Sequence, residues 1–393
     1  MIAEERKHPI VSKQLDYIQC MIKKIGVVSY NIYGNFTNYG SALQSWALHQ
    51  AIDNVSNGEC EPILVDYCPD VLKDKDPLNP FNNMWDQDEE SRRMCELSMP
   101  AIHENYYKFE SFYTRSFDRT QKRYTSMNFD EVIEDAELSG FVCGSDTIFC
   151  MDEFGFDDGF FANYACMKQN SVAYAASFGD PTLSEENCRK LNGRLKNFKA
   201  IGLRENLMIP YVMEHTDVSV KRVLDPTLLH TCEKYDEIAV QERLEKDKYI
   251  LLYSRRYSSV MEKYAEELAD KKGWKIVEIS LRATNKNKGH RMYYQAGVEE
   301  FLSLVKHAEY VVTNSFHGMI FAVQYKRPFV IFSREQCNNK IDEILQCLGL
   351  SNRMLVTGKE NFLETINYES VHQKISKARK ESLQFLREEL ELL

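Results

Sequence analysis

Short apolar segments alternate with amphipathic helical segments along the chain, and this alternation constrains the fold more than any other feature. Strands are predicted at 25–29, 62–66, 139–143, 171–177 and 199–203 in the first half, and at 248–253, 274–279, 309–313 and 328–332 in the second. Helices are predicted at 40–54, 90–115, 184–197, 258–272, 298–307, 316–325 and 338–348. Strands that are separated by helices form βαβ units on a parallel sheet, so the sequence predicts an α/β fold.

The chain has 393 residues, which is too long for one ordinary domain and sufficient for two. Because the strand–helix pattern restarts in the second half, we predict two Rossmann-like domains facing a cleft, at residues 21–227 and 228–368. Met21 precedes the first predicted strand closely, so residues 1–20 are set apart as an N-terminal extension. Residues 369–393 are predicted to form a charged helix that can pack back on the first domain. Ligands of such folds bind at the carboxyl ends of the strands, which here border the cleft.

The balance of charged residues is acidic, with 49 Lys and Arg against 59 Asp and Glu and a net charge of −10. An acidic surface repels phosphate backbones, which argues against nucleic acid as a partner. No apolar run reaches the roughly 18 residues of a membrane span, and the N-terminus lacks the apolar run of a signal peptide. We therefore expect a cytoplasmic location, with peripheral membrane contact left open. The 11 cysteines form no C-x-x-C pair, which is typical of thiols in a reducing compartment and predicts no zinc site.

Small and polar residues lie where predicted strands end, and they are the candidates for lining the cleft or contacting a ligand. Backbone N–H groups exposed at a helix start can bind an anion or a sugar hydroxyl, whereas the plainer interpretation is a helix cap, and both stay open. The dinucleotide motif G-x-G-x-x-G and the Walker P-loop do not occur, which argues against NAD and ATP. The candidates are Asn38, Tyr39, Gly40, Gln44, Gly144, Ser145, Asp146, Ser177 and, in the second domain, Asn314.

Arg204 follows the strand predicted at 199–203. An arginine at the carboxyl end of a strand faces the cleft and can bind a phosphate or a carboxylate through its planar guanidinium. The alternative is a surface arginine paired with the neighbouring Glu205.

The segment Val311–Gly318 carries the sharpest indication of chemistry. A buried strand leads into a helix whose first turn contains His317, with Ser315 placed as the N-cap. An imidazole titrates near neutral pH, so His317 at the cleft can give or take a proton. The alternative is a histidine that only fixes the turn by hydrogen bonding. The 9 histidines show no metal-ligand spacing, and no metal site is predicted.

Six motifs occur in the order in which a known family carries them: NYGSALQSWAL, GSDTIF, VAYAASFG, IGLREN, LDPTLL and TNSFHGMIFAVQYKRPF. On these motifs the chain resembles the polysaccharide pyruvyl transferase family over about residues 24–350. The resemblance implies a two-domain architecture like that of the GT-B glycosyltransferases. It also implies transfer of pyruvate from phosphoenolpyruvate to two hydroxyls of a sugar, as a cyclic ketal, in the synthesis of bacterial capsule, exopolysaccharide or cell-wall polymers.

The resemblance also implies roles for individual residues. His317 matches by position the histidine that activates phosphoenolpyruvate, and Arg204 matches an arginine that binds it. Some family members carry a further arginine two residues before the histidine, where this chain has Ser315. Either Arg255 or Arg256 then supplies the missing charge, or the donor is held differently. No cofactor is implied besides phosphoenolpyruvate as co-substrate, and the expected acceptor is a lipid- or nucleotide-linked glycan.

Two other functions stay open at this point. One is a GT-B-type glycosyltransferase that uses a nucleotide sugar. This alternative stays open because Ser315 stands where some family members carry an arginine. The other is a non-catalytic glycan-binding subunit, against which the intact Asn38–Gln44 turn and the presence of His317 argue. The acceptor is expected to contact the loops 69–95 and 282–296, the first of which is a predicted insertion.

Overall fold

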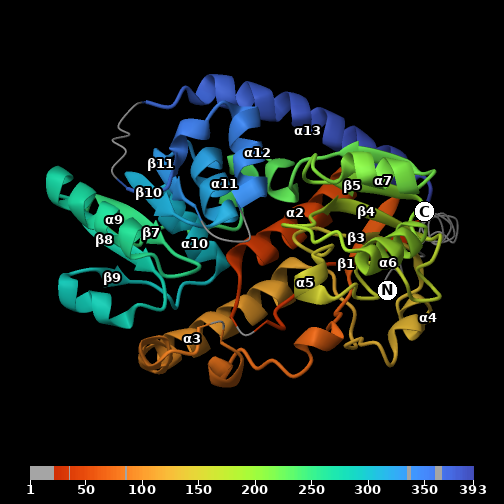
Figure 1. The fold of residues 1–393 in the computed structure, drawn as a ribbon, viewed down its shortest axis with the longest axis horizontal. Coiled ribbons are helices and arrows are strands. Elements are labelled where there is room, and N and C mark those ends of the chain that lie inside the picture. Colours follow the sequence, from red (N-terminus) through yellow and green to blue (C-terminus); the bar gives the residue numbers. More distant parts are fainter. Residues whose placement is uncertain (1–21, 35, 85, 334–337, 359–364) are drawn as a thin grey trace, which may run out of the picture.

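The computed structural model describes residues 22–34, 36–84, 86–333, 338–358 and 365–393. In this part of the chain the strands form two six-stranded sheets with helices packed around them (Figure 1). Every pairing between neighbouring strands of the two sheets is parallel. The predicted architecture of two Rossmann-like domains is therefore confirmed. The predicted extension at residues 1–20 lies outside the described residues.

The first sheet has the strand order β2-β1-β3-β4-β5-β6. Its central strands are continuous apolar runs because helices cover a parallel sheet on both faces; all six residues of β4 are buried. Its strands are β1 (Lys23–Val28), β2 (Cys60–Leu64), β3 (Leu138–Cys143), β4 (Ser171–Ala176), β5 (Ala200–Leu203) and β6 (Ser219–Arg222).

The second sheet has the order β12-β11-β10-β7-β8-β9. Its central strands β7, β10 and β11 are likewise buried along their whole length. Its strands are β7 (Tyr249–Tyr253), β8 (Lys275–Ile279), β9 (Arg291–Met292), β10 (Tyr310–Thr313), β11 (Phe329–Phe332) and β12 (Met354–Leu355).

The long helices agree with the predicted ranges to within about three residues, because apolar residues recur along them and several begin at a polar N-cap. At the start of α2, for example, the Asn38 side chain accepts a hydrogen bond from the Gly40 N–H at 3.0 Å. The helices are α2 (Tyr39–Ser56), α3 (Glu89–Ser116), α4 (Val132–Asp135), α5 (Met151–Phe154), α6 (Glu185–Leu195), α7 (Ile209–His215), α8 (Cys232–Asp236), α9 (Ser259–Lys272), α10 (Val298–Lys306), α11 (Phe316–Gln324), α12 (Asn338–Leu348) and α13 (Tyr368–Leu390).

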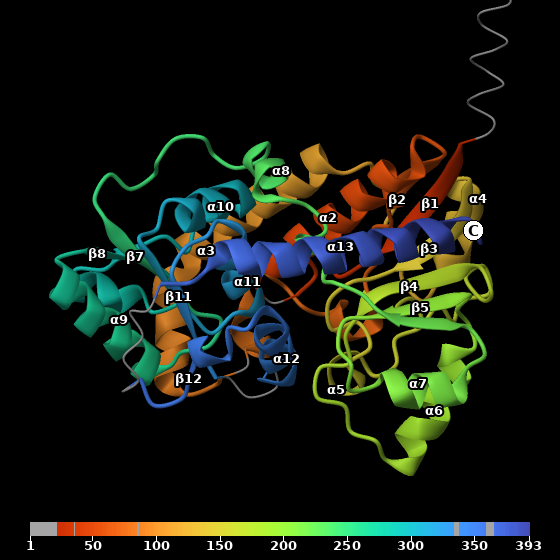
Figure 2. The same cartoon turned by 90° about the horizontal axis from the view of Figure 1, so that it is seen from above.

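Helix α13 runs from the second sheet back across the first half of the molecule (Figure 2). Its Phe385 is fully buried and packs over Tyr174 of β4, with ring centroids 6.4 Å apart. The predicted return of this helix to the first domain is therefore confirmed.

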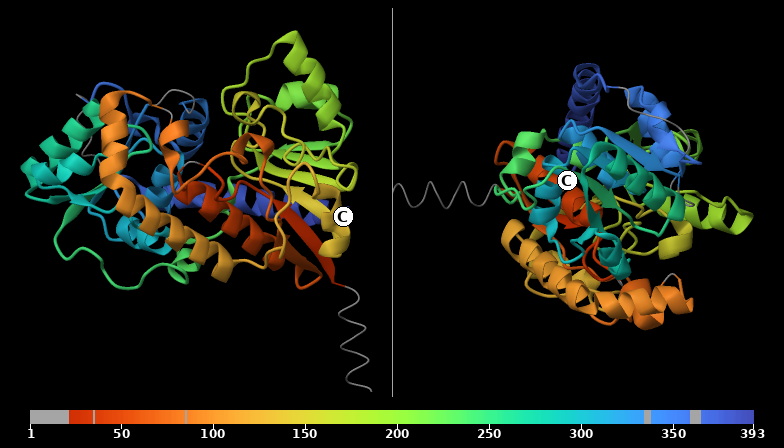
Figure 3. Two further views of the ribbon diagram at one scale, coloured as in Figure 1. Left: turned by 90° about the horizontal axis from the view of Figure 1, so that it is seen from below. Right: turned by 90° about the vertical axis from the view of Figure 1, so that its left-hand side faces the viewer.

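Helix α3 joins the two halves on the opposite side, where it reaches from the first sheet to the second (Figure 3). Its Lys108 pairs with Glu300 of α10 at 2.8 Å, and its Asn105 side chain donates to the Ala296 carbonyl. The segment 223–248 between the sheets contacts both halves. His230 Nε2 lies 2.8 Å from the Ala47 carbonyl oxygen of α2, and Gln324 of α11 donates to the Thr227 carbonyl at 2.7 Å. The boundary at 227/228 stays a prediction.

The predicted insertion at 69–95 contains two short 3-10 turns, Asp70–Leu72 and Pro80–Asn83, and then the first turns of α3. No helix in the described ranges combines the length and the apolar character that a membrane span needs.

Candidate active site

The order of the strands locates the site. In the first sheet the chain moves outward from β1 to β2 and then crosses to β3 on the other side, so the switch point lies between β1 and β3. In the second sheet the corresponding point lies between β7 and β10. Ligands of open parallel sheets bind at the carboxyl ends of the strands beside such a point. The segments that follow these strands carry Gly144–Asp146 in the first half, and Ser254–Arg256 and Asn314–His317 in the second.

His317 lies in the first turn of α11 and is buried against the first half of the molecule. The predicted capping is confirmed, because the Ser315 hydroxyl accepts the Gly318 N–H at 3.2 Å. The imidazole packs so closely on α2 that a Cβ atom added to Gly40 would lie 1.9 Å from His317 Nδ1. Glycine at position 40 therefore makes room for the histidine ring.

A carboxylate that the sequence did not single out lies on the other side of the ring. Asp225 Oδ2 is 3.4 Å from His317 Nε2 and 2.8 Å from a terminal nitrogen of Arg204. Burial alone would raise the pKa of the Asp225 carboxyl, but the Arg204 guanidinium and His317 outweigh it and hold that pKa well below its usual range. Asp225 is thus an anion that connects an arginine of the first half to a histidine of the second.

Arg204 turns inward from the end of β5, and its side chain is 4% exposed. The alternative of a surface arginine is therefore wrong. Besides its pair with Asp225, Arg204 donates to the Ser145 hydroxyl at 2.6 Å and lies 3.7 Å from Asp146. Its guanidinium also lies 5.3 Å from the centre of the Phe316 ring, within cation–π range. The short contacts to Ser145 and Asp225 are both made by the same terminal nitrogen, Nη2.

Asp146 follows β3 and faces the same group of side chains. Its carboxylate accepts the Ser41 hydroxyl at 2.9 Å. Burial would raise the pKa of Asp146, but Arg204, His317 and Lys340 together lower it.

Three of the predicted lining residues form the base below Asp146. The Ser145 N–H donates to the Gln44 side chain at 2.9 Å, and Gln44 and Ser145 are fully buried. At Gly144 a Cβ atom would lie 2.0 Å from the Tyr174 carbonyl oxygen, and φ is +155°, so only glycine fits there. The structure brings these residues together as the support of the site.

Tyr39 and Ser177 also lie inside the protein. Tyr39 stacks on Phe301 with ring centroids 4.4 Å apart, and its hydroxyl donates to the Ala296 carbonyl at 2.7 Å. The Ser177 hydroxyl accepts the Gly179 N–H at 3.2 Å. Tyr39 thus holds the two halves together.

In the second half, Asn314 holds the loop after β7. Its side chain accepts the Arg255 N–H at 2.9 Å and donates to the Arg256 carbonyl at 2.7 Å. The Arg255 side chain is exposed and reaches across to donate to the Thr37 carbonyl at 3.0 Å. Arg255 therefore crosses from the second switch point to the first half of the molecule.

Lys340 of α12 is the second residue that the sequence did not single out. It is 7% exposed, and its ammonium group lies 5.8 Å from the centre of the Phe316 ring. Among the described residues, no carboxylate lies within 4 Å of that ammonium group. Lys340 lines a narrow pocket at the junction of the two halves together with Arg204, Glu205, Asp225 and Phe316.

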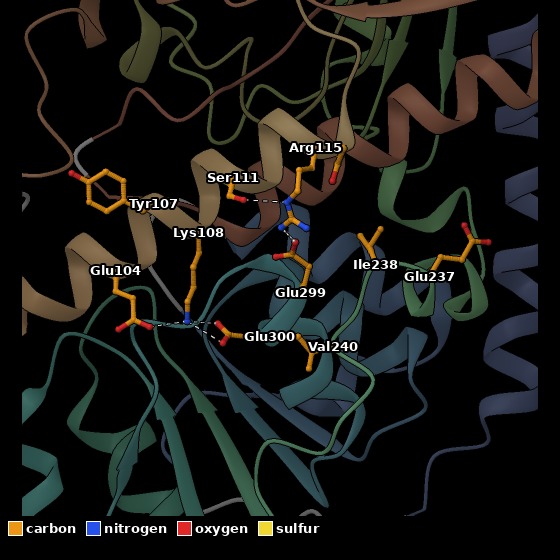
Figure 4. Close-up of a pocket in the computed structure, with 11 residues that line it drawn as sticks. Glu104, Tyr107, Lys108, Ser111, Arg115, Glu237, Ile238, Val240, Glu299 and Glu300 are labelled. Atoms are coloured by element: carbon orange, nitrogen blue, oxygen red, sulfur yellow. Dashed lines mark hydrogen bonds and ion pairs between the residues drawn. The ribbon is translucent and has the colours of Figure 1, made fainter.

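A larger pocket of about 760 Å³ lies elsewhere, between α3, α10 and the segment after α8 (Figure 4). Its charged side chains pair with one another, as Arg115 does with Glu299 at 2.8 Å. None of the predicted site residues lines it.

Fold and site together define a class: a protein of two parallel α/β halves with a buried histidine, arginine and carboxylate cluster where the carboxyl edges of the two sheets meet. The model of the polysaccharide pyruvyl transferase family matches residues 38–336, and the chain belongs to this family. No curated protein matches the sequence.

Solved structures resemble the chain only distantly. The S. aureus MnaA–UDP co-structure is 15% identical, with 94% of this chain and 91% of that chain covered and a TM-score of 0.49. A putative UDP-N-acetylglucosamine 2-epimerase from Listeria monocytogenes is 11% identical, with coverage of 93% and 90% and a TM-score of 0.49. E. coli ADP-heptose lps heptosyltransferase II is 12% identical, with coverage of 92% and 99% and a TM-score of 0.36. The fold assignment rests on the sheet topology.

Proposed function

We propose that this chain transfers the pyruvyl group of phosphoenolpyruvate to two hydroxyls of a sugar and so forms a cyclic ketal during the synthesis of a bacterial surface polysaccharide, as capsule or exopolysaccharide. The observation that carries the proposal is the position of His317. Its imidazole lies at the junction of the two sheets, between Asp225 and Gly40, with Arg204 and Lys340 nearby. This arrangement places one group that can carry a proton, His317, near two cationic side chains. Phosphoenolpyruvate requires both, a proton for its methylene carbon and cations for its phosphate and carboxylate.

The reaction needs a proton on carbon. A general acid protonates the methylene carbon of phosphoenolpyruvate, the electrons of the C=C bond form the new C–H bond, and C2 becomes electrophilic. One sugar hydroxyl attacks C2 and loses its proton. Inorganic phosphate then leaves, and the second hydroxyl attacks C2, loses its proton and closes the ketal. His317 is the group we assign to the first step.

The phosphate and carboxylate of the donor need cations that the protein has not already neutralised. Arg204 donates to Ser145 and pairs with Asp225, so we assign it mainly to holding the site together. Arg255, which is exposed at the second switch point, and Lys340 are better placed to meet the donor. They would compensate for the serine at position 315, and Arg256 follows Arg255 in the loop after β7.

The acceptor we propose is a lipid- or nucleotide-linked glycan, met in the cytoplasm. Asp146 and Ser41, which are hydrogen-bonded to each other at 2.9 Å, are the groups proposed to face the sugar hydroxyls, because Asp146 is close enough to His317 for their charges to interact. The chemistry as written requires no cofactor.

The test compares wild type, His317→Asn and His49→Asn. His49 is a matched control because it is also a buried histidine, 5% exposed against 6% for His317, but lies further along α2. Phosphate release from phosphoenolpyruvate is measured with a panel of lipid-linked and nucleotide-linked glycans, and the product is identified by mass spectrometry. Loss of a general acid typically lowers the rate by about 10²–10⁴. We expect His317→Asn to fold and to turn over at least about a hundredfold more slowly, and His49→Asn to keep its turnover per folded molecule.

Donor binding is measured separately by the melting temperature. A ligand at a hundredfold excess over its Kd stabilises by about 2.7 kcal/mol. With an unfolding entropy of about 2.1 cal/mol/K per residue, this raises the melting temperature of 393 residues by about 3 °C if the chain unfolds as one unit. A rise with UDP-N-acetylglucosamine but none with phosphoenolpyruvate would contradict the proposal and favour a glycosyltransferase.

A further inference from the structure

Asp225 is a buried carboxylate that the reaction described above does not use, although three segments of the chain meet at it. It precedes the short 3-10 turn Pro226–Leu228 and is 2% exposed. Its two oxygens have different partners, and this division points to its role.

One oxygen is bound within its own turn. Asp225 Oδ1 accepts the Thr227 N–H at 2.9 Å and the Thr227 hydroxyl at 2.5 Å. These two bonds fix the rotation of the carboxylate. They leave Oδ2 for Arg204, at 2.8 Å, and for His317 Nε2, at 3.4 Å.

The charge of Asp225 is also fixed. The guanidinium of Arg204 is permanently charged and stabilises the ionised carboxylate. A buried carboxylate beside an imidazole accepts the hydrogen of the nearer ring nitrogen and determines which tautomer is present. The ring nitrogen that remains is Nδ1, which lies over Gly40 at the first turn of α2.

We propose that Asp225 is the positioning residue of His317: it holds a hydrogen on Nε2, orients the ring toward α2, and leaves Nδ1 to deliver the proton to the substrate. The assignment rests on the proposed function for the identity of that substrate. In the reacting state both ring nitrogens carry hydrogen. The Nδ1 proton passes to the methylene carbon, the electrons of the C=C bond form the C–H bond, and the ring returns to the neutral Nε2–H form. A proton released by a sugar hydroxyl restores the imidazolium.

Charged groups from every side influence this imidazole. Asp225 and Asp146 come from the first half and are negative. Arg204 from β5 and Lys340 from α12 are positive. Since Asp225 Oδ2 faces both Arg204 and His317, replacing the carboxylate removes one negative charge from beside both groups.

The experiment replaces Asp225 by asparagine, which keeps the shape but removes the charge. Removing the carboxylate of a histidine–aspartate pair lowers kcat by about 10⁴ in serine proteases. For Asp225→Asn we expect a loss in kcat of at least about 10², with the KM for phosphoenolpyruvate changed by less than about threefold. The limb of the pH–rate profile that reports protonation of the histidine moves to lower pH by about one unit or more. In ¹⁵N NMR spectra the His317 signals lose the pattern of a single Nε2–H tautomer.

The control is Asp157→Asn, the same substitution at a carboxylate that is bound by Tyr67 and by the N–H groups of Gly159 and Phe160 in a separate cluster. It is expected to leave kcat and the His317 signals unchanged. If Asp225→Asn lowers the melting temperature but keeps wild-type kcat and an unchanged NMR pattern, Asp225 is structural and the inference is overturned.

If Asp225→Asn does not fold, a second variant tests the proposal. Thr227→Val removes the hydroxyl that fixes Oδ1 and leaves the charge in place. A several-fold fall in kcat at unchanged KM supports positioning, whereas an unchanged kcat overturns it. A wild-type enzyme that does not turn over phosphoenolpyruvate would contradict the proposed function alone, because the NMR comparison still shows whether Asp225 sets the tautomer of His317.

Discussion

Replacing Gly40 by alanine tests the contact on which the site depends. In most helix positions this change is stabilising, by roughly 0.5–1 kcal/mol, since glycine loses more backbone freedom on folding. At position 40 the added Cβ would lie 1.9 Å from His317 Nδ1, 2.4 Å from Cγ and 2.7 Å from Cε1, whereas ordinary contact begins at 3.4 Å. The imidazole must therefore move away by about 3.4 − 1.9 = 1.5 Å.

The ring has little room for that movement, because Asp225 lies 3.4 Å from its far side. Overpacking of this kind typically costs about 1–3 kcal/mol, which the helical gain offsets in part. The net loss of stability is then at most about 2.5 kcal/mol. With an unfolding entropy of about 0.8 kcal/mol/K for 393 residues, this corresponds to about 3 °C in melting temperature. By contrast, a catalytic group displaced by about 1 Å can lose on the order of a hundredfold in rate.

The assay measures turnover of phosphoenolpyruvate and melting temperature on the same preparation. Gly193→Ala is the matched control, since Gly193 is an exposed helix residue of α6 and a Cβ there meets nothing within 4 Å. We expect the control to gain stability and keep its turnover, and Gly40→Ala to lose about a hundredfold in turnover with a small change in melting temperature. A Gly40→Ala variant that behaves like the control would refute the placement of His317 against α2.

Two further predictions concern single charged groups. Lys340→Met removes a buried ammonium group that faces the pocket. A charged contact contributes about 1.5–3 kcal/mol, so the KM for phosphoenolpyruvate should rise by about 10-fold or more while the melting temperature stays unchanged. An unchanged KM would exclude Lys340 from donor binding. Burial raises the pKa of Asp157 to about 6, so this group stabilises the fold below its unfolded pKa near 4 and the contribution is lost as pH rises through 6. Asp157→Asn should therefore have wild-type stability near pH 4 and a relative gain above pH 6, measured by urea unfolding; a gain that is independent of pH would contradict this.

The sequence predicts the central parts of the fold well because their physical causes are local. Strands such as β7 and β10 are buried on both faces and therefore appear as short continuous apolar runs. The strands that were missed have no such run: β6 reads Ser-Val-Lys-Arg at the edge of the first sheet, with every residue at least partly exposed. Strands β9 and β12 are each only two residues long.

Some residues of the candidate site could likewise be predicted from the local sequence, and others could not. Turns such as Gly144–Asp146 and Asn314–His317 could be recognised because small polar residues interrupt an apolar run where a strand ends. The sequence indicates Lys340 less directly. This lysine shares a helical face with Ile341, Ile344 and Leu345, which are all buried in α12. A lysine on an apolar face is costly unless something compensates for it, and this criterion could have identified it.

Asp225 could not be identified by any local criterion. Its neighbours explain it as the start of a turn, which it is, because Thr227 binds one of its oxygens. The role of its second oxygen becomes clear only in the folded structure, where Arg204 and His317 from other segments of the chain lie beside it. That information lies in the arrangement of the two sheets and in no spacing along the chain.

The same arrangement makes the site composite. The proposed proton carrier His317 belongs to the second half, but the surface on which its ring rests, Gly40, and the carboxylate beside it, Asp225, precede the second sheet in the chain. Arg255 crosses in the same direction to the Thr37 carbonyl. A movement that separates the halves would take the histidine away from both of its contacts at once. A change that weakens contacts between the halves away from the site, such as the pair of Lys108 with Glu300, should therefore lower kcat through the position of His317, although it touches no substrate.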